Sequence, residues 1–194
     1  MKREIKHLFG NRVALQLVEE EYPGLIVPAS TMERVYVLSR VVAVGDQVTQ
    51  DIKVGDILFW QTNGIIQKQC RYDLNGVATF ILMTGDMIAR LKNRVVTREQ
   101  FECIGDWCLL KRVTVQPSKL IVVPDEVVET NQETTVKFLL EAKGETVDTW
   151  KDAPERALAI GAEVVVDRSR ANPIKLGEDT YYYIHKNFVL GTIG

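Results

Sequence analysis

The sequence of 194 residues contains few side chains with the chemistry for catalysis or metal binding. Its two histidines, His7 and His185, lie in different halves, and no serine, cysteine or carboxylate stands at a catalytic-motif spacing from either. The cysteines Cys70, Cys103 and Cys108 form no Cys-x-x-Cys pair, which argues against a zinc site or a redox pair. We therefore expect a protein that is not an enzyme, has no cofactor and keeps its thiols reduced.

The most informative feature of the sequence is a pattern that occurs twice. An aliphatic run closed by a proline occurs twice, as Gly24-Leu25-Ile26-Val27-Pro28 and as Leu120-Ile121-Val122-Val123-Pro124. Such a run is more typical of a buried strand than of an exposed segment that contacts a partner. The residues alone leave both interpretations open.

These two runs belong to a longer internal repeat. Val54-Gly55-Asp56-Ile57 recurs loosely as Ile160-Gly161-Ala162-Glu163, and Asp86-Met87-Ile88 recurs as Asn187-Phe188-Val189. The three matched pairs are 96, 106 and 101 residues apart, so insertions separate them. The repeat predicts two small domains, over residues 1–95 and 101–194.

The elements that must position the two runs are short β-strands. Val13, Leu15 and Leu17 alternate with polar or small residues, which is the period of a half-buried strand. Gly, Pro and Asp turns separate this segment from further short apolar stretches. Strands are predicted over 35–44, 57–60, 78–83, 107–112, 137–140, 163–166 and 181–184. Many short strands between turns predict an all-β fold, with a small barrel or sandwich in each half.

Charge and hydropathy exclude several classes of partner. The formal net charge is −2 with acidic and basic residues intermixed, so no basic field for sequence-independent nucleic-acid binding is expected. No apolar run of about 18 residues occurs, so we expect no membrane span. The first residues, Met1-Lys2-Arg3-Glu4-Ile5, lead directly into a strand pattern without the apolar core of a signal peptide. A cytoplasmic location is the resulting expectation.

Five motifs follow one another in the first half. They are Asn11-Arg12-Val13, Gly24-Leu25-Ile26-Val27-Pro28, Val41-Val42-Ala43-Val44-Gly45, Lys53-Val54-Gly55-Asp56-Ile57-Leu58-Phe59 and Asp86-Met87-Ile88-Ala89. In this order they resemble the GroES-type co-chaperonins, the lids of the bacterial chaperonin cage, over nearly all of residues 8–95. The second half resembles a diverged copy, in which Lys119 replaces the glycine before the aliphatic run.

The resemblance implies a fold of two tandem GroES-like small β-barrels and a function as a lid. Its partner would be a GroEL-type chaperonin ring, which binds and hydrolyses the ATP, and unfolded client proteins would be reached indirectly. The family assembles as a homo-oligomeric ring. The chaperonin-binding residues carried over by the resemblance are Gly24, Leu25, Ile26 and Val27 in the first half, and Leu120, Ile121 and Val122 in the second.

A second function remains open. Divergent co-chaperonins resembling this chain are carried by bacteriophages, and a duplicated copy could serve as a structural or assembly protein, for example a virion component, without binding a chaperonin. A shared fold does not fix a shared function. The two hypotheses differ in the aliphatic segments, which a lid would order on its partner and a structural protein would keep ordered throughout.

Overall fold

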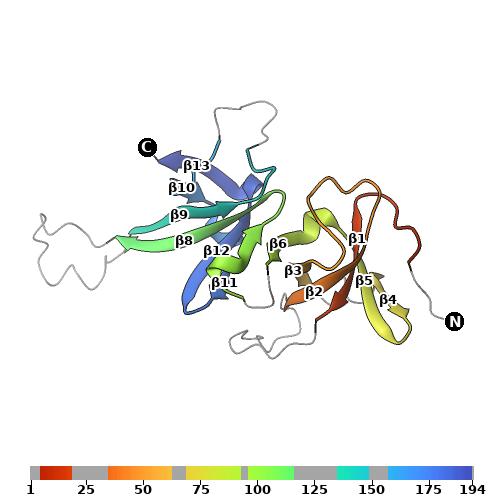
Figure 1. Ribbon diagram of the computed structural model, residues 1–194. Coiled ribbons are helices and arrows are strands. Elements are labelled where there is room, and N and C mark those ends of the chain that lie inside the picture. The colour runs from red at the N-terminus through yellow and green to blue at the C-terminus, as the bar shows by residue number, and fades with distance from the viewer. Residues whose placement is uncertain are drawn as a thin grey trace, which may run out of the picture.

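The computed structural model describes residues 5–18, 35–62, 69–92, 96–115, 135–148 and 157–193, which form an all-β protein with two antiparallel sheets (Figure 1). The predicted all-β class is confirmed. The first sheet contains β1 (Arg12–Leu17), β2 (Val35–Val44), β3 (Ile57–Thr62), β4 (Arg71–Leu74), β5 (Val77–Met83), β6 (Met87–Leu91) and β7 (Phe101–Cys103). The second contains β8 (Trp107–Val115), β9 (Thr135–Lys143), β10 (Glu163–Val166), β11 (Asn172–Leu176), β12 (Asp179–His185) and β13 (Val189–Ile193).

The two sheets have the same topology. The strand order is β4-β5-β1-β2-β3-β6-β7 in the first sheet and β11-β12-β8-β9-β10-β13 in the second. Strands β8 to β13 therefore correspond one by one to β1 to β6, and the internal repeat of the sequence is also a repeat of topology. Strand β7 is the exception, because it comes from the predicted second domain and pairs with β6 in the first sheet. The domain bounds at 95 and 101 stay a prediction.

A close glycine contact occurs at the same place in both halves. Gly10 and Gly105 have φ angles of +75° and +58°, in the left-handed region that favours glycine. Each presents its carbonyl oxygen to a second glycine: a Cβ on Gly45 would lie 2.1 Å from Gly10 O, and one on Gly144 would lie 2.2 Å from Gly105 O. The two contacts therefore show that Gly10 of the first repeat corresponds to Gly105 of the second, and that Gly45 corresponds to Gly144.

The residues after these glycines complete the match. The Asp46 carboxylate accepts a hydrogen bond from Gly10 N–H at 2.6 Å, and the Glu145 carboxylate accepts one from Gly105 N–H at 2.9 Å. Both carboxylates thus satisfy the amide of a positive-φ glycine. The second half keeps the geometry of this corner with a longer acidic side chain.

The glycine turn before β3 and β10 confirms the predicted spacing of 106 residues. Gly55 N–H donates to Val41 O at 2.9 Å, and Gly161 N–H donates to Leu140 O at 2.7 Å.

The third predicted match, Asp86 with Asn187, was wrong by one residue. Met87 pairs with Trp60 after a register shift in β3, and Val189 pairs with Val166 after the same shift in β10. Met87 therefore corresponds to Val189, 102 residues later. The sequence comparison had matched Asp86 with Asn187 because both are polar turn residues. The strand register instead matches residues by their place in the hydrogen-bonded strand pair.

Each sheet has its own apolar core. The first consists mainly of Val13, Leu15, Val41, Ile52, Leu58, Trp60, Phe80, Leu82, Met87 and Ile104. The second consists mainly of Cys108, Leu110, Phe138, Leu140, Val147, Leu158, Val164, Val166 and Ile184. Ile104 belongs to the core of the first sheet although it follows β7, so the second repeat contributes a buried side chain to the first.

A third core is shared by the two sheets. Its residues come from β2, β3, β6 and β7 on one side and from β8, β11 and β12 on the other. Phe59 lies edge-on to Phe101 and to Tyr183, with ring centroids 5.6 Å and 6.1 Å apart. Side chains alternate across β3, so that Leu58 enters the first sheet's own core while Phe59 enters the shared one. Both faces of β3 are therefore buried.

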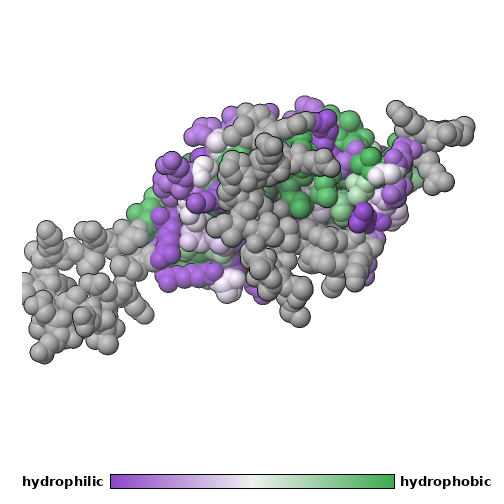
Figure 2. Space-filling view, turned by 90° about the horizontal axis from the view of Figure 1, so that it is seen from below, coloured by the Kyte–Doolittle hydropathy of each residue, from purple (hydrophilic) through white to green (hydrophobic). Residues whose placement is uncertain are grey.

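Apolar side chains are also exposed on both halves. Leu17, Val77 and Met83 are exposed in the first half, and Leu190 and Ile193 in the second. Figure 2 shows one face, on which hydrophilic side chains border a hydrophobic area over the first sheet.

The glycine contact yields a stability prediction. Gly45→Ala and Gly144→Ala each force a methyl group against a backbone carbonyl, which cannot move as a side-chain end could, and each should cost about 1–3 kcal/mol of unfolding free energy. The measurement is the urea midpoint of unfolding. Gly85→Ala is the matched control, because a Cβ there meets nothing within 4 Å. Equal midpoints for all three variants would contradict the contact.

Candidate partner-binding site

The predicted binding residues lie outside the described part of the chain. This holds for Gly24, Leu25, Ile26 and Val27 and for Leu120, Ile121 and Val122. What the structure gives is their place in the topology: the first set falls between β1 and β2, and the second between β8 and β9. Since β1 corresponds to β8 and β2 to β9, both aliphatic runs occupy the equivalent connection of their sheets.

Paired strands lead to both connections. In the first ribbon, which is formed by β1 and β2, Leu17 pairs with Ser39. Val18 N–H continues this pairing with a hydrogen bond of 3.1 Å to Leu38 O. The second ribbon, which is formed by β8 and β9, is longer and ends where Val115 pairs with Thr135. Each connection therefore leaves and re-enters its sheet at adjacent points.

The core anchors the first ribbon near its end. Ser39 is buried on β2, and its hydroxyl oxygen accepts a hydrogen bond of 2.9 Å from the indole N–H of the buried Trp60. The Trp60 ring in turn contacts Phe80, with centroids 5.6 Å apart. A buried polar pair that is satisfied in this way fixes the strand register, because a slip by one residue would leave both groups unpaired.

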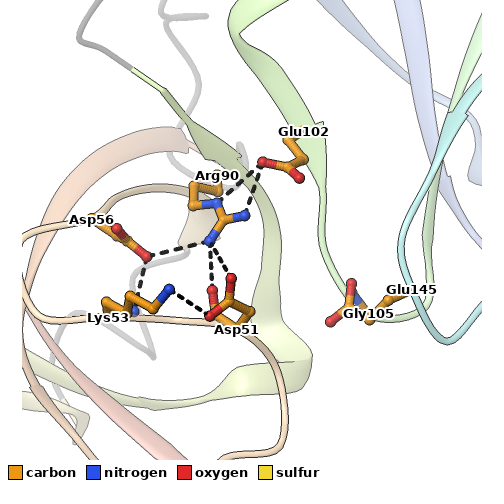
Figure 3. Close-up of polar contacts among 7 residues, drawn as sticks. All are labelled: Asp51, Lys53, Asp56, Arg90, Glu102, Gly105 and Glu145. Carbon is orange, nitrogen blue, oxygen red and sulfur yellow. Dashed lines mark hydrogen bonds and ion pairs between the residues drawn. The ribbon is translucent and has the colours of Figure 1, made fainter.

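Arg90 on β6 is the centre of a charged cluster at the junction of the two halves (Figure 3). Its guanidinium donates two hydrogen bonds to Glu102 Oε2 on β7, at 3.0 Å and 3.2 Å, and one to the backbone oxygen of Asp51 at 2.6 Å. Asp56 Oδ2 lies 3.7 Å away. With its partners supplied by this one chain, the cluster holds β7 against β6 rather than presenting a free anion site.

Asp106, between β7 and β8, organises a second polar cluster. Lys186 Nζ lies 2.8 Å from Asp106 Oδ1, which also accepts a hydrogen bond from the Thr146 hydroxyl, and Lys186 Nζ donates to Thr146 O at 2.9 Å. Burial tends to raise the pKa of Asp106, but the hydrogen bonds from Lys186 and Thr146 outweigh it and hold that pKa below its usual value. This cluster closes the corner of the second sheet.

The structure places His185 at the end of β12, beside Asp106. His185 Nε2 lies 3.8 Å from Asp106 Oδ2, and its Nδ1 accepts a hydrogen bond of 3.3 Å from Asn187 N–H. Partial burial lowers the pKa of His185, a shift that Asp106 opposes and Lys186 reinforces. No local sequence signal joins residues 106 and 185, because the contact depends on the pairing of β8 with β12.

Neither of the two buried cysteines close to Asp106 in the sequence, Cys103 and Cys108, is an activated nucleophile. Cys108 is fully buried, and burial raises its pKa to about 12, so its thiol is protonated at neutral pH. Burial also raises the pKa of Cys103. Among the residues that the structure describes, no group of three or more His, Cys, Asp or Glu side chains could hold a metal ion.

Within the described ranges, no helix has the length and apolar character needed to cross a membrane.

The pKa of His185 gives a prediction of pH dependence. Because the pKa is lowered by folding, the unfolded chain binds more protons as the pH falls through about 6.5, and the unfolding free energy should decrease there. In His185→Asn, which keeps a side-chain acceptor for the Asn187 amide, part of this decrease should disappear. Urea midpoints across this pH range measure the effect. An unchanged pH dependence would show that His185 does not contribute to it.

Comparison with known proteins adds no family: no protein-family model matches the chain, and no curated protein matches it.

Proposed function

We propose that this chain is a tandem co-chaperonin-like lid, which caps an ATP-loaded chaperonin ring through its two aliphatic segments and so assists protein folding. In this proposal each sheet curls into a GroES-like barrel, and the chain itself has no catalytic activity. Three features support it: the ordered motifs of the first half, the common topology of the two sheets, and the position of the aliphatic runs.

The position of the runs is the feature on which the proposal mainly rests. Leu25-Ile26-Val27 and Leu120-Ile121-Val122 fall in equivalent connections, between strands that also correspond in order and register. The register shift between Ala14 and Leu15 recurs between Leu109 and Leu110. A duplicated domain that keeps an aliphatic run at one place, while other motifs change, is consistent with a use of that run outside the domain core.

Magnitudes explain why such a lid would act through several segments at once. Burial of three aliphatic side chains yields roughly 5–9 kcal/mol before costs. Ordering about ten residues of a connecting segment costs on the order of 10 kcal/mol or more. One segment therefore binds weakly, and linked segments reach useful affinity through their effective concentration. A duplicated chain supplies two segments in one molecule.

The test is co-sedimentation of the chain with a purified chaperonin ring, with ATP, with ADP and without nucleotide. Ile26→Asp should abolish nucleotide-dependent association, because a carboxylate cannot enter an apolar groove without a large desolvation cost. Ile121→Asp tests the second segment in the same way. Ile160→Asp is the matched control, since Ile160 is an exposed aliphatic residue that does not belong to either segment.

The outcomes separate the two candidate functions. Absence of nucleotide-dependent binding by the unaltered chain, tested with the chaperonin of its own host, would reject the lid and favour a structural or assembly role. Circular dichroism and the urea midpoint accompany each variant. If Ile26→Asp unfolds the protein, Ile26 is a core residue and its assignment to the binding segment is wrong.

A further inference from the structure

The same short turn follows a strand in each repeat. One 3₁₀ turn, η1 (Thr84–Asp86), follows β5, and another, η5 (Lys186–Phe188), follows β12. Met83 and His185 precede these turns, and each pairs with the residue two positions after the positive-φ glycine of its repeat. Strand register therefore places His185 at the position of Met83. The second repeat has an ionisable side chain where the first has a thioether.

The two side chains cap their turns differently. The Met83 side chain makes no hydrogen bond to η1, whereas His185 Nδ1 accepts one of 3.3 Å from Asn187 N–H in η5. An imidazole nitrogen can accept a hydrogen bond only while it carries no proton. A proton on Nδ1 and the hydrogen bond from Asn187 therefore exclude each other, whatever the pH at which the proton binds.

The His185 ring also contacts a residue that joins the two repeats. Trp107, at the start of β8, lies edge-on to His185 with ring centroids 5.4 Å apart. The Trp107 indole N–H crosses the junction and donates a hydrogen bond of 3.2 Å to the carbonyl oxygen of Gly85, in η1. The Trp107 side chain also packs against the core that the two sheets share. The cap of η5 and the contact between the repeats thus meet at one aromatic pair.

More positive than negative charge surrounds the His185 ring. Asp106 Oδ2 lies 3.8 Å from His185 Nε2, but Asp106 Oδ1 is already paired with Lys186 Nζ at 2.8 Å. The Phe188 ring contacts His185 with centroids 6.4 Å apart, and the Arg170 guanidinium lies over the other ring of this pair. One carboxylate therefore stands beside two cations, so a further positive charge on the imidazole is poorly compensated.

We propose that His185 is a proton-sensitive switch at the junction of the repeats: its neutral ring caps η5 and supports Trp107 against the first repeat, and protonation releases both contacts. A proton that binds at Nδ1 displaces the hydrogen bond from Asn187 N–H, and two N–H groups cannot stay pointed at each other. The imidazole must then turn, and it loses its edge-on contact with Trp107. The junction loosens locally, while the strand pairing of both sheets stays intact.

The direction of the response follows from the burial of the ring. Partial burial has the largest effect and lowers the pKa of His185 in the folded protein, a shift that Asp106 opposes. The closed switch is therefore fully formed above the ordinary imidazole pKa of about 6.5, and it is lost as the pH falls below that value. Met83 does not titrate, so the matching corner of the first repeat should have no such response.

The first test is acrylamide quenching of Trp107 fluorescence in the folded chain, without denaturant. Trp150→Phe removes another of the three tryptophans, and the remaining Trp60 is 0% exposed, so the quencher reaches mainly Trp107. The quenching constant should rise about twofold between about pH 7.5 and about pH 5.5, because release of the His185 ring uncovers the indole. A constant that does not change over this range would overturn the proposal.

Variants of the two histidines identify the group that titrates. His185→Met places the cap residue of the first repeat in the second, and it should remove the pH dependence of the quenching constant. His185→Asn keeps an acceptor for the Asn187 amide without a titrating group and should do the same, so one variant remains informative if the other fails to fold. His7→Asn is the matched control, because it removes the other, exposed histidine and should keep the full rise. A rise that persists in the His185 variants, or that disappears in His7→Asn, would reject the switch.

The second test separates local release from general unfolding by comparing two equivalent amides. Lys186 N–H donates to Asp106 O at 2.8 Å, and Thr84 N–H donates to Asn11 O at 3.2 Å at the matching place in the first repeat. Hydrogen exchange of both amides is followed by NMR and corrected for the intrinsic effect of pH. The protection factor of Lys186 should fall severalfold, and at most about tenfold for each pH unit below about 6.5, because closure competes with one proton.

The amide of Thr84 is the internal control for this experiment. Its protection factor should change by less than about twofold, because no titrating cap precedes η1. Equal losses at Thr84 and Lys186 would mean that the chain opens as a whole, and unchanged protection at Lys186 would mean that η5 stays closed; either result would contradict the switch. Neither test involves a chaperonin, so this inference stands or fails separately from the proposed function.

Discussion

The apolar core shared by the two sheets is the interaction on which the rest of the structure depends. Domains of just under 100 residues bury a limited core of their own, so a common core adds burial that neither half achieves alone. Here it includes Phe59 and Tyr183, whose rings meet edge-on across the junction. Ile104 strengthens the same junction, because a residue of the second repeat fills the core of the first. The two connections that contain the aliphatic runs are consequently held by one continuous folded body.

Duplication followed by divergence explains why the two repeats differ where they do. The glycine corners, formed by Gly10 with Gly45 and by Gly105 with Gly144, are preserved because backbone meets backbone there and a side chain has no room. The charged groups around Arg90 have no counterpart in the second repeat, where Thr192 takes its position. Backbone constraints have thus been kept in both copies, while side-chain electrostatics are specific to the internal junction.

Much of the strand pattern was predictable from local sequence, and strands β4 and β11 were missed for different physical reasons. Strand β1 was predicted from the alternation of Val13, Leu15 and Leu17. Strand β4 was missed because three of its four residues are exposed, so it has no apolar period, although Asn75-Gly76 after it is a strong hairpin signal. Strand β11 contains Pro173, which an edge strand tolerates and which disfavours a strand in a local interpretation. For the candidate site, sequence located the aliphatic runs, and topology added that they occupy equivalent connections.

By itself the sequence determined the all-β class, the period of the main strands and the existence of a repeat, because these follow from side-chain alternation and turn residues that act locally. Only the tertiary structure decided that β7 joins the first sheet, that Asp106 meets Lys186 and His185, and that Leu190 and Ile193 remain uncovered while Ile88 and Leu91 are buried. Strand pairing and burial join residues far apart in the chain. Nothing in the alternation of a single strand states which partner will cover its outer face.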